Sequence, residues 1–131
     1  MIPVSDKTVL VLGGGIGGLV AARELRRRLD PTDRVVLVDR RSTSSFAPSL
    51  LWVMSGLRRA DQIAIDLRRL RRRGIEIVTA DVLEIDAARG KVSTREGGLA
   101  FDRLVVALGA DLAPDAMPGF SEGAHNVYTL E

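Results

Sequence analysis

The sequence predicts an α/β domain with a central parallel sheet, flanking helices and a β-meander. Three short, uninterrupted apolar runs predict the sheet, because parallel strands covered on both faces are apolar throughout. They lie at residues 8–12 (TVLVL), 35–38 (VVLV) and 104–108 (LVVAL). An amphipathic segment of helical period separates the first two runs. Residues 8–39 therefore predict a βαβ unit, whose crossover is right-handed.

Size and composition predict one domain over residues 1–131. Of the 131 residues, 46% are hydrophobic, which is enough for a buried core. The net charge is only +2, because the sequence has 19 basic and 17 acidic residues. Although the pI is about 9.7, this near balance argues against a nucleic-acid partner. Without a signal-peptide pattern or an apolar stretch of roughly 20 residues, we expect a cytoplasmic location.

The first helix is predicted from residue 16 to the vicinity of Pro31, and its inward face carries apolar residues at spacings of three and four, namely Ile16, Leu19, Ala22, Leu25 and Leu29. Residues 42–56 predict a loop that leads into a short helix. Residues 60–73 predict a second helix with Ile63, Leu67 and Leu70 inward, which ends at Gly74.

The remaining segments predict strands separated by turns. We expect a strand at residues 75–78, then a meander at residues 81–86 and 91–95, with turns at residues 89–90 and 97–98. Residues 101–108 are predicted to return to the central sheet as one strand. The segment after Ala110 is rich in Pro, Gly and Asp and is expected to be a loop that leads away from the domain.

The glycines between the first strand and the first helix follow the pattern G-x-G-x-x-G through Gly13, Gly15 and Gly18. Gly13 allows a tight turn, Gly15 lets a diphosphate approach the backbone, and Gly18 permits close packing of helix and strand. The free N–H groups around Ile16, Gly17 and Gly18 at the helix N-terminus favour an anion. The motif in its βαβ context therefore predicts a Rossmann-like domain that binds a dinucleotide.

Asp39 ends the second strand and is predicted to accept hydrogen bonds from the ribose of the adenosine half. An acid at this position disfavours a 2′-phosphate, whereas Arg40 and Arg41 directly after it would favour one. We include Arg40 among the candidate cofactor-binding residues. The motif alone leaves NAD, NADP and FAD open.

Five stretches resemble, in their order, the N-terminal FAD-binding segment of the pyridine nucleotide-disulfide oxidoreductase superfamily, flavoproteins with two dinucleotide-binding domains. These stretches are TVLVLGGGIGGLVAARELRRRL, RVVLVDR, FAPSLLWVMSG, IEIVTADVLEID and FDRLVVALGA. Within the superfamily the chain is most similar to the branch of sulfide:quinone oxidoreductase and flavocytochrome c sulfide dehydrogenase, which is related to type II NADH dehydrogenases. The resemblance implies an FAD/NAD(P)-binding fold and electron or hydride transfer through FAD.

The resemblance also implies further site residues. The family's A-T-G turn beside the flavin dinucleotide corresponds to Ala107, Leu108 and Gly109, with leucine in place of threonine. Val82 matches the position whose backbone pairs with the adenine edge, and Pro48 lies in the stretch that runs near the flavin end. The sequence identifies no catalytic residue.

The chain departs from the family in its cysteines and its length. It contains no cysteine, so these residues offer no thiol for sulfide oxidation, and Tyr128 stands at or next to the first cysteine position of the resembling enzymes. Relatives are longer, so we expect a fragment or truncation of a longer flavoprotein that is catalytically incomplete by itself. Apolar surface exposed by truncation could also produce a homodimer, which would have no biological meaning. The resemblance further implies a quinone or pyridine nucleotide as partner of the full-length protein, which could associate peripherally with a membrane.

Two interpretations compete with the flavoprotein. One is an NAD(P)-dependent oxidoreductase, and the other is a non-catalytic module that binds nucleotides. No metal site is predicted, because His125 is the only histidine and cysteine is absent. The arginine-rich run at residues 68–73 lacks interleaved aromatic residues and predicts a solvated helix face.

Overall fold

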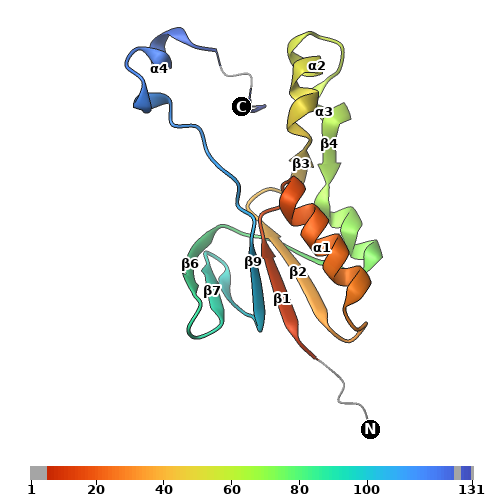
Figure 1. The fold of residues 1–131 in the computed structure, drawn as a ribbon. Coiled ribbons are helices and arrows are strands. Elements are labelled where there is room, and N and C mark those ends of the chain that lie inside the picture. The colour runs from red at the N-terminus through yellow and green to blue at the C-terminus, as the bar shows by residue number, and fades with distance from the viewer. Residues whose placement is uncertain (1–5, 126–127, 131) are drawn as a thin grey trace.

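The computed structural model describes residues 6–125 and 128–130, and it confirms the α/β class with a parallel central sheet. The sheet has four strands in the order β5-β2-β1-β9 (Figure 1). Their bounds are Thr8–Leu12 for β1, Arg34–Asp39 for β2, Glu76–Thr79 for β5 and Arg103–Val106 for β9. All three neighbouring pairs are parallel, so the carboxyl ends of these strands meet at one edge.

Helices cover one face of the sheet and the meander covers the other (Figure 1). On the first face, α1 (Ile16–Arg28) and the 3₁₀ helix η2 (Leu67–Arg73) pack against Val11 and Leu37. On the second face, Val92 packs against Leu10 and Val38. The meander is made of β6 (Val82–Asp86), β7 (Lys91–Thr94) and β8 (Gly97–Ala100). Burial from both sides explains the apolar runs in β1 and β2.

A small subassembly rises above the carboxyl edge of the sheet (Figure 1). Its base is an antiparallel pair of short strands, β3 (Thr43–Ser45) and β4 (Ala64–Asp66). Between them lie the 3₁₀ helix η1 (Ala47–Ser49) and the helices α2 (Leu50–Met54) and α3 (Ala60–Ile63). The predicted loop and short helix at residues 42–56 are thus present, and β3 is an addition that its polar sequence did not indicate.

The predicted single helix at residues 60–73 is wrong. The segment divides into α3, β4 and η2. The break occurs because residues 64–66 pair with β3, and the Asp66 side chain then accepts the Arg68 N–H at 2.9 Å and caps a new helix. The inward positions were nevertheless correct, since Ile63 and Leu67 are buried and Leu70 packs against the core.

The second half of the chain also differs in detail from the prediction. Residues 97–98 begin β8 rather than form a turn, and the turn lies at residues 95–96. Residues 101–108 are not one strand, because Asp102 leaves the meander and its carboxylate accepts the Thr8 N–H at 2.7 Å. After Ala110 the chain leads away from the sheet as predicted, and it also forms η3 (Pro114–Ala116) and α4 (Phe120–Gly123) (Figure 1).

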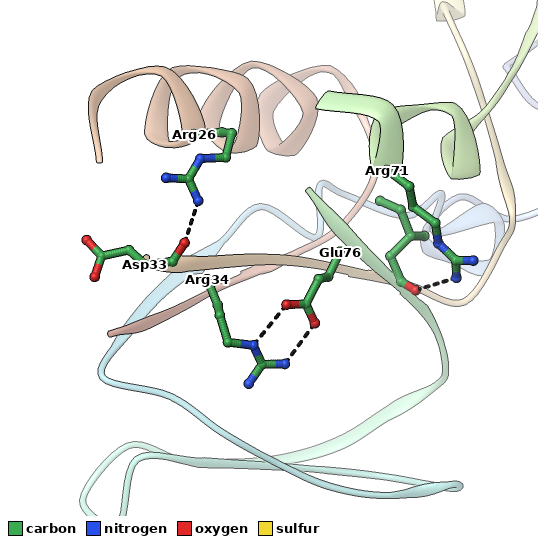
Figure 2. A network of polar contacts seen from close by, with 6 residues as sticks. Arg26, Asp33, Arg34, Arg71 and Glu76 are labelled. Atoms are coloured by element: carbon green, nitrogen blue, oxygen red, sulfur yellow. Dashed lines mark hydrogen bonds and ion pairs between the residues drawn. The ribbon is translucent and has the colours of Figure 1, made fainter. Parts of the chain in front are cut away.

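Polar contacts fasten the sheet and its helices on the side away from the carboxyl edge (Figure 2). Arg26 of α1 donates to the backbone carbonyl of Asp33, just before β2. Arg34 and Glu76 form a bidentate ion pair between β2 and β5, with N–O distances of 2.8 and 2.7 Å. These contacts join α1, β2 and β5 at the amino ends of the strands.

Candidate dinucleotide-binding site

The glycine turn between β1 and α1 is packed so tightly that side chains are excluded at two positions. Gly13 has a φ of +102°, and a Cβ on it would lie 2.2 Å from the carbonyl oxygen of Ala107. A Cβ on Gly18 would lie 1.8 Å from the carbonyl oxygen of Gly13. The local roles predicted for these glycines, a tight turn and close packing, agree with this geometry.

Gly15 differs because no atom lies within 4 Å of the position where its Cβ would be. The residue is exposed, and its φ of −72° is accessible to any amino acid. Packing inside the described structure therefore gives no reason for a glycine here. Space above the backbone is what a ligand that approaches this turn requires.

The N-terminus of α1 presents unused hydrogen-bond donors beside Gly15. The first bond of the helix runs from Leu19 N–H to the Gly15 carbonyl at 2.9 Å. The amides of Ile16, Gly17 and Gly18 have no acceptor within residues 6–125 and 128–130. The helix also lacks a side-chain cap and an acidic residue in its first turn. Such an end favours an anion, above all a phosphate.

Asp39 holds the glycine turn and two neighbouring segments together. Its Oδ2 accepts the Gly14 N–H at 2.5 Å, and its Oδ1 accepts the Arg41 N–H at 2.7 Å. Its backbone carbonyl accepts the Ala80 N–H at 2.9 Å, directly after β5. Since each carboxylate oxygen accepts two hydrogen bonds, the side chain keeps capacity for a ligand hydroxyl. The sequence did not indicate this structural role.

Leu67 supports the same turn from the helical face of the sheet. A Cβ on Gly14 would lie 2.7 Å from Leu67 Cδ1. Leu67 is the first residue of η2, which Asp66 caps. Hydrogen bonds from the side chain and backbone of Arg68 lower the pKa of Asp66, so its carboxylate remains charged at neutral pH. The new helix that begins after the break thus places Leu67 against Gly14 of the glycine turn.

A pocket of about 300 Å³ opens at the carboxyl edge next to this turn, and we call it the first pocket. It lies between the ends of β1, β2 and β5 and the start of the meander. Its lining joins the glycine turn and the segment of the predicted acid with two other segments of the chain. The lining residues are Gly13, Val38, Asp39, Arg40, Arg41, Ala80, Asp81, Val82, Leu108 and Asp111.

Two further pockets adjoin the first. The second pocket, of about 330 Å³, is lined by Arg40, Arg41, Ser45, Leu108, Gly109, Ala110, Asp111, Tyr128, Thr129 and Leu130. The third pocket, of about 170 Å³, is lined by Gly14, Gly15, Asp39, Arg41, Thr43, Ser44, Ser45, Ala64 and Leu130. Arg41 borders all three pockets. The three pockets therefore adjoin one another at Arg41, and the third pocket borders the turn before α1 at Gly14 and Gly15.

Seven of the twelve predicted site residues border these pockets, whereas Ile16, Gly17 and Gly18 begin α1 directly after Gly15 and border none of them. Gly13, Asp39, Arg40, Val82 and Leu108 border the first pocket. Gly109 borders the second pocket and Gly15 the third, whereas Ala107 packs behind the glycine turn. Pro48 is exposed in η1 and borders none of the three pockets. Its predicted place near the cofactor is therefore not supported by proximity in this structure.

Sequence reasoning did not select several of the lining residues. Arg41 was considered only for a 2′-phosphate, although it borders every pocket. Asp81 lies two residues after the end of β5 and Asp111 five residues after the end of β9, so the motif that selected Asp39 does not reach them. Thr43, Ser44 and Ser45 carried no signal, because their strand was not predicted.

Residues 7–131 match the family described as pyridine nucleotide-disulphide oxidoreductase. The chain belongs to this family. A sulfide-quinone reductase from Aquifex aeolicus is 32% identical over 127 residues, which are 95% of this chain and 29% of that protein. An alternative NAD(P)H-ubiquinone oxidoreductase of Arabidopsis thaliana, C1, chloroplastic/mitochondrial, is 36% identical over 94% of this chain and 27% of that protein.

Solved structures agree with this assignment. The crystal structure of the sulfide:quinone oxidoreductase from Aquifex aeolicus matches with a TM-score of 0.87 and 30% identity, over 94% of this chain and 29% of that one. NDH2 from Plasmodium falciparum, solved with NADH, has a TM-score of 0.73 at 19% identity and supports the fold alone. The chain therefore spans less than a third of these relatives. The family resemblance stated from the sequence is confirmed.

Two other kinds of feature are absent from the described residues. No helix among them is both long and apolar enough to cross a bilayer. No cluster of three or more His, Asp or Glu side chains in the described part of the chain is arranged to hold a metal ion. The candidate site is thus defined by backbone amides, one clamped carboxylate and the arginines after it.

Proposed function

We propose that this chain binds FAD and is the FAD-binding portion of a larger flavin-dependent oxidoreductase. The observation that carries the proposal is the N-terminus of α1, where three unused amides lie beside open space at Gly15. The diphosphate of a dinucleotide satisfies amides of this kind and needs the missing Cβ. The first and second pockets, which adjoin each other, offer room for the two halves of the cofactor.

The first pocket suits the adenosine half. Asp39 at its edge can accept a ribose hydroxyl while it holds the glycine turn. Val82 borders the same pocket at the start of β6, where its backbone can meet the adenine edge. Arg40 and Arg41 bring positive charge toward the diphosphate. The role of each residue is part of the proposal.

The reaction of the full-length protein is proposed from the family and the names of its relatives. FAD supplies electron or hydride transfer, and the residues of this chain bind and orient it. We propose a reduced small molecule or a pyridine nucleotide as donor and a quinone as acceptor, since relatives carry both in their names. Sulfide oxidation by thiols is not assigned to these residues, which contain no cysteine. We further propose a cytoplasmic location, with peripheral association of the full-length protein with a membrane.

One specific observation favours a second candidate, an NAD(P)-dependent oxidoreductase. Arg40 and Arg41 directly follow the ribose-facing acid and border the first pocket, where they could hold a 2′-phosphate. A non-catalytic nucleotide-binding module is the third candidate, and it predicts binding of ADP without electron transfer. Competition between cofactors separates these cases.

A titration of the purified chain with FAD, followed by flavin fluorescence anisotropy, tests the proposal. ADP, NAD and NADP serve as competitors. We expect saturable binding of FAD that ADP displaces, because ADP is the adenosine half of the cofactor. Binding of NAD or NADP without a response to FAD would support the nicotinamide enzyme instead. Absence of binding by all four would refute the dinucleotide site.

Two aspartate variants link binding to the proposed site. Asp39→Ala removes the acceptor for the Gly14 and Arg41 amides and should weaken FAD at least tenfold. Asp86→Ala is the matched control, because Asp86 also accepts a backbone N–H, from Arg89 at 2.9 Å, and lies in the meander away from the three pockets. Equal loss of FAD binding in both variants would refute the assignment of the site.

A further inference from the structure

We propose that Tyr128 contacts the half of the cofactor beyond the diphosphate, which for FAD is the isoalloxazine ring. This inference rests on the proposed function, because it assigns the second pocket within the same site. Tyr128 is the only tyrosine of the chain and the only aromatic residue among the described residues that border the three pockets.

The first and second pockets adjoin each other and offer separate places for the two halves of the cofactor. The first pocket contains Asp39 and Val82, the residues suited to adenosine. The second pocket shares Arg40, Arg41, Leu108 and Asp111 with the first and is of similar size, about 330 against 300 Å³. A dinucleotide whose adenosine fills the first pocket therefore has the second pocket for its other half.

The lining of the second pocket suits a planar ring. Gly109 has a φ of +79° and no atom within 4 Å of the position of its missing Cβ, so a ligand can approach the backbone there. Tyr128 and Leu130 enclose the pocket from the C-terminal segment, and the Tyr128 side chain is 57% exposed. A ring with exposed surface can still bury that surface against a heteroaromatic ligand.

Aromatic contact makes the contribution of Tyr128 specific to one half of the cofactor. An offset stack or an edge-to-face contact stabilises a ring pair by an amount equivalent to about threefold to tenfold in affinity. ADP lacks the second ring and should bind equally well whether or not Tyr128 is present. The ratio of FAD affinity to ADP affinity therefore measures the contact.

Three variants test the inference. Tyr128→Ala should weaken FAD about threefold to tenfold and leave ADP unchanged. Tyr128→Phe keeps the ring and should bind FAD within about twofold of wild type, but its bound flavin should be brighter. A tyrosine in contact with an excited flavin quenches its fluorescence, because the phenol donates an electron to the flavin and then recovers it. Phenylalanine is much harder to oxidise and therefore does not quench in this way. Phe120→Ala is the control, since Phe120 is an exposed ring of the same C-terminal segment that borders none of the three pockets.

The outcomes separate this inference from the proposed function. If wild-type protein binds FAD but Tyr128→Ala and Tyr128→Phe change neither affinity nor fluorescence, the inference is overturned while the proposed function stands. Equal weakening of FAD and ADP by Tyr128→Ala also overturns it, because the ring would then support the adenosine half or the fold. If the wild-type chain does not bind FAD, both fail.

Discussion

Replacing Gly15 by aspartate should make the fold more stable and at the same time strongly weaken dinucleotide binding. Gly15 is the N-cap of α1, with φ −72° and ψ −174°, and an added side chain meets no atom within 4 Å. The helix has neither a side-chain cap nor an acid in its first turn. Aspartate at this position can accept the free amides of Gly17 or Gly18, which are the groups proposed to hold the diphosphate.

The two effects have opposite signs and different sizes. Aspartate exceeds glycine as an N-cap by a few tenths of a kcal/mol, and its charge at the helix end adds about 0.3–1 kcal/mol. The net gain in unfolding free energy is therefore about 0.5–1 kcal/mol. Against binding, two like charges about 4 Å apart repel by about 4 kcal/mol at an effective dielectric constant of about 20. Even after half of this is lost to screening, FAD affinity should fall at least about thirtyfold.

Urea unfolding and FAD titration of the same protein preparations measure both effects. Gly15→Ser is the matched variant, because serine caps the helix without a charge and should weaken FAD less than aspartate does. Gly123→Ala controls for an added Cβ at an exposed site, since nothing lies within 4 Å of that position either. An FAD affinity of Gly15→Asp within threefold of wild type would refute the reasoning, and so would a loss of stability.

Three further predictions concern the scaffold of the site. Gly18→Ala should lower the unfolding free energy by about 2 kcal/mol or more, because its Cβ would lie 1.8 Å from the Gly13 carbonyl oxygen, and an unchanged urea midpoint would contradict the packing argument. Arg26→Ala should lower the unfolding free energy by about 1–3 kcal/mol in the same assay, because Arg26 donates to three backbone carbonyls between α1 and β2. A loss below about 0.5 kcal/mol would show that these hydrogen bonds do not stabilise the fold. The hydrogen bond from Arg34 lowers the pKa of Glu76 below its usual 4.5. The ion pair therefore stabilises the fold fully above pH 4.5, and this stabilisation is lost as the pH falls through the lowered pKa that Glu76 has in the folded protein. Glu76→Gln should therefore be less stable by about 0.5 kcal/mol at pH 7 and equal to wild type at strongly acidic pH, whereas a difference that persists in acid would contradict the linkage.

The parts of the fold that could be predicted are those with local patterns. The strands β1 and β2 and the helix α1 are specified by apolar periods and by glycines, and their bounds agree with the prediction to within about three residues. The exception on the inward face of α1 is Ile16, which is exposed at the start of the helix. The acid at the end of β2 followed from the same unit. These signals are strong because both faces of the sheet are covered, so nearly every residue of the inner strands contributes.

The parts that could not be predicted depend on contacts between distant residues. β3 and β4 form only because residues 43–45 meet residues 64–66, and neither segment has a strand pattern. Ile63, Leu67 and Leu70 fit one helix by spacing, yet the cap at Asp66 starts a new one. The clamp of Asp39 on the Gly14 amide likewise joins two loops that only the folded sheet brings together.

The central claim is that a dinucleotide binds through the free amides at the start of α1, and the most direct test is an amide nuclear magnetic resonance titration with ADP. The account predicts the largest shifts at Gly15, Ile16, Gly17 and Gly18, with further shifts at the residues that line the first pocket. Saturable shifts confined to another part of the chain, or none at millimolar ADP, would contradict it.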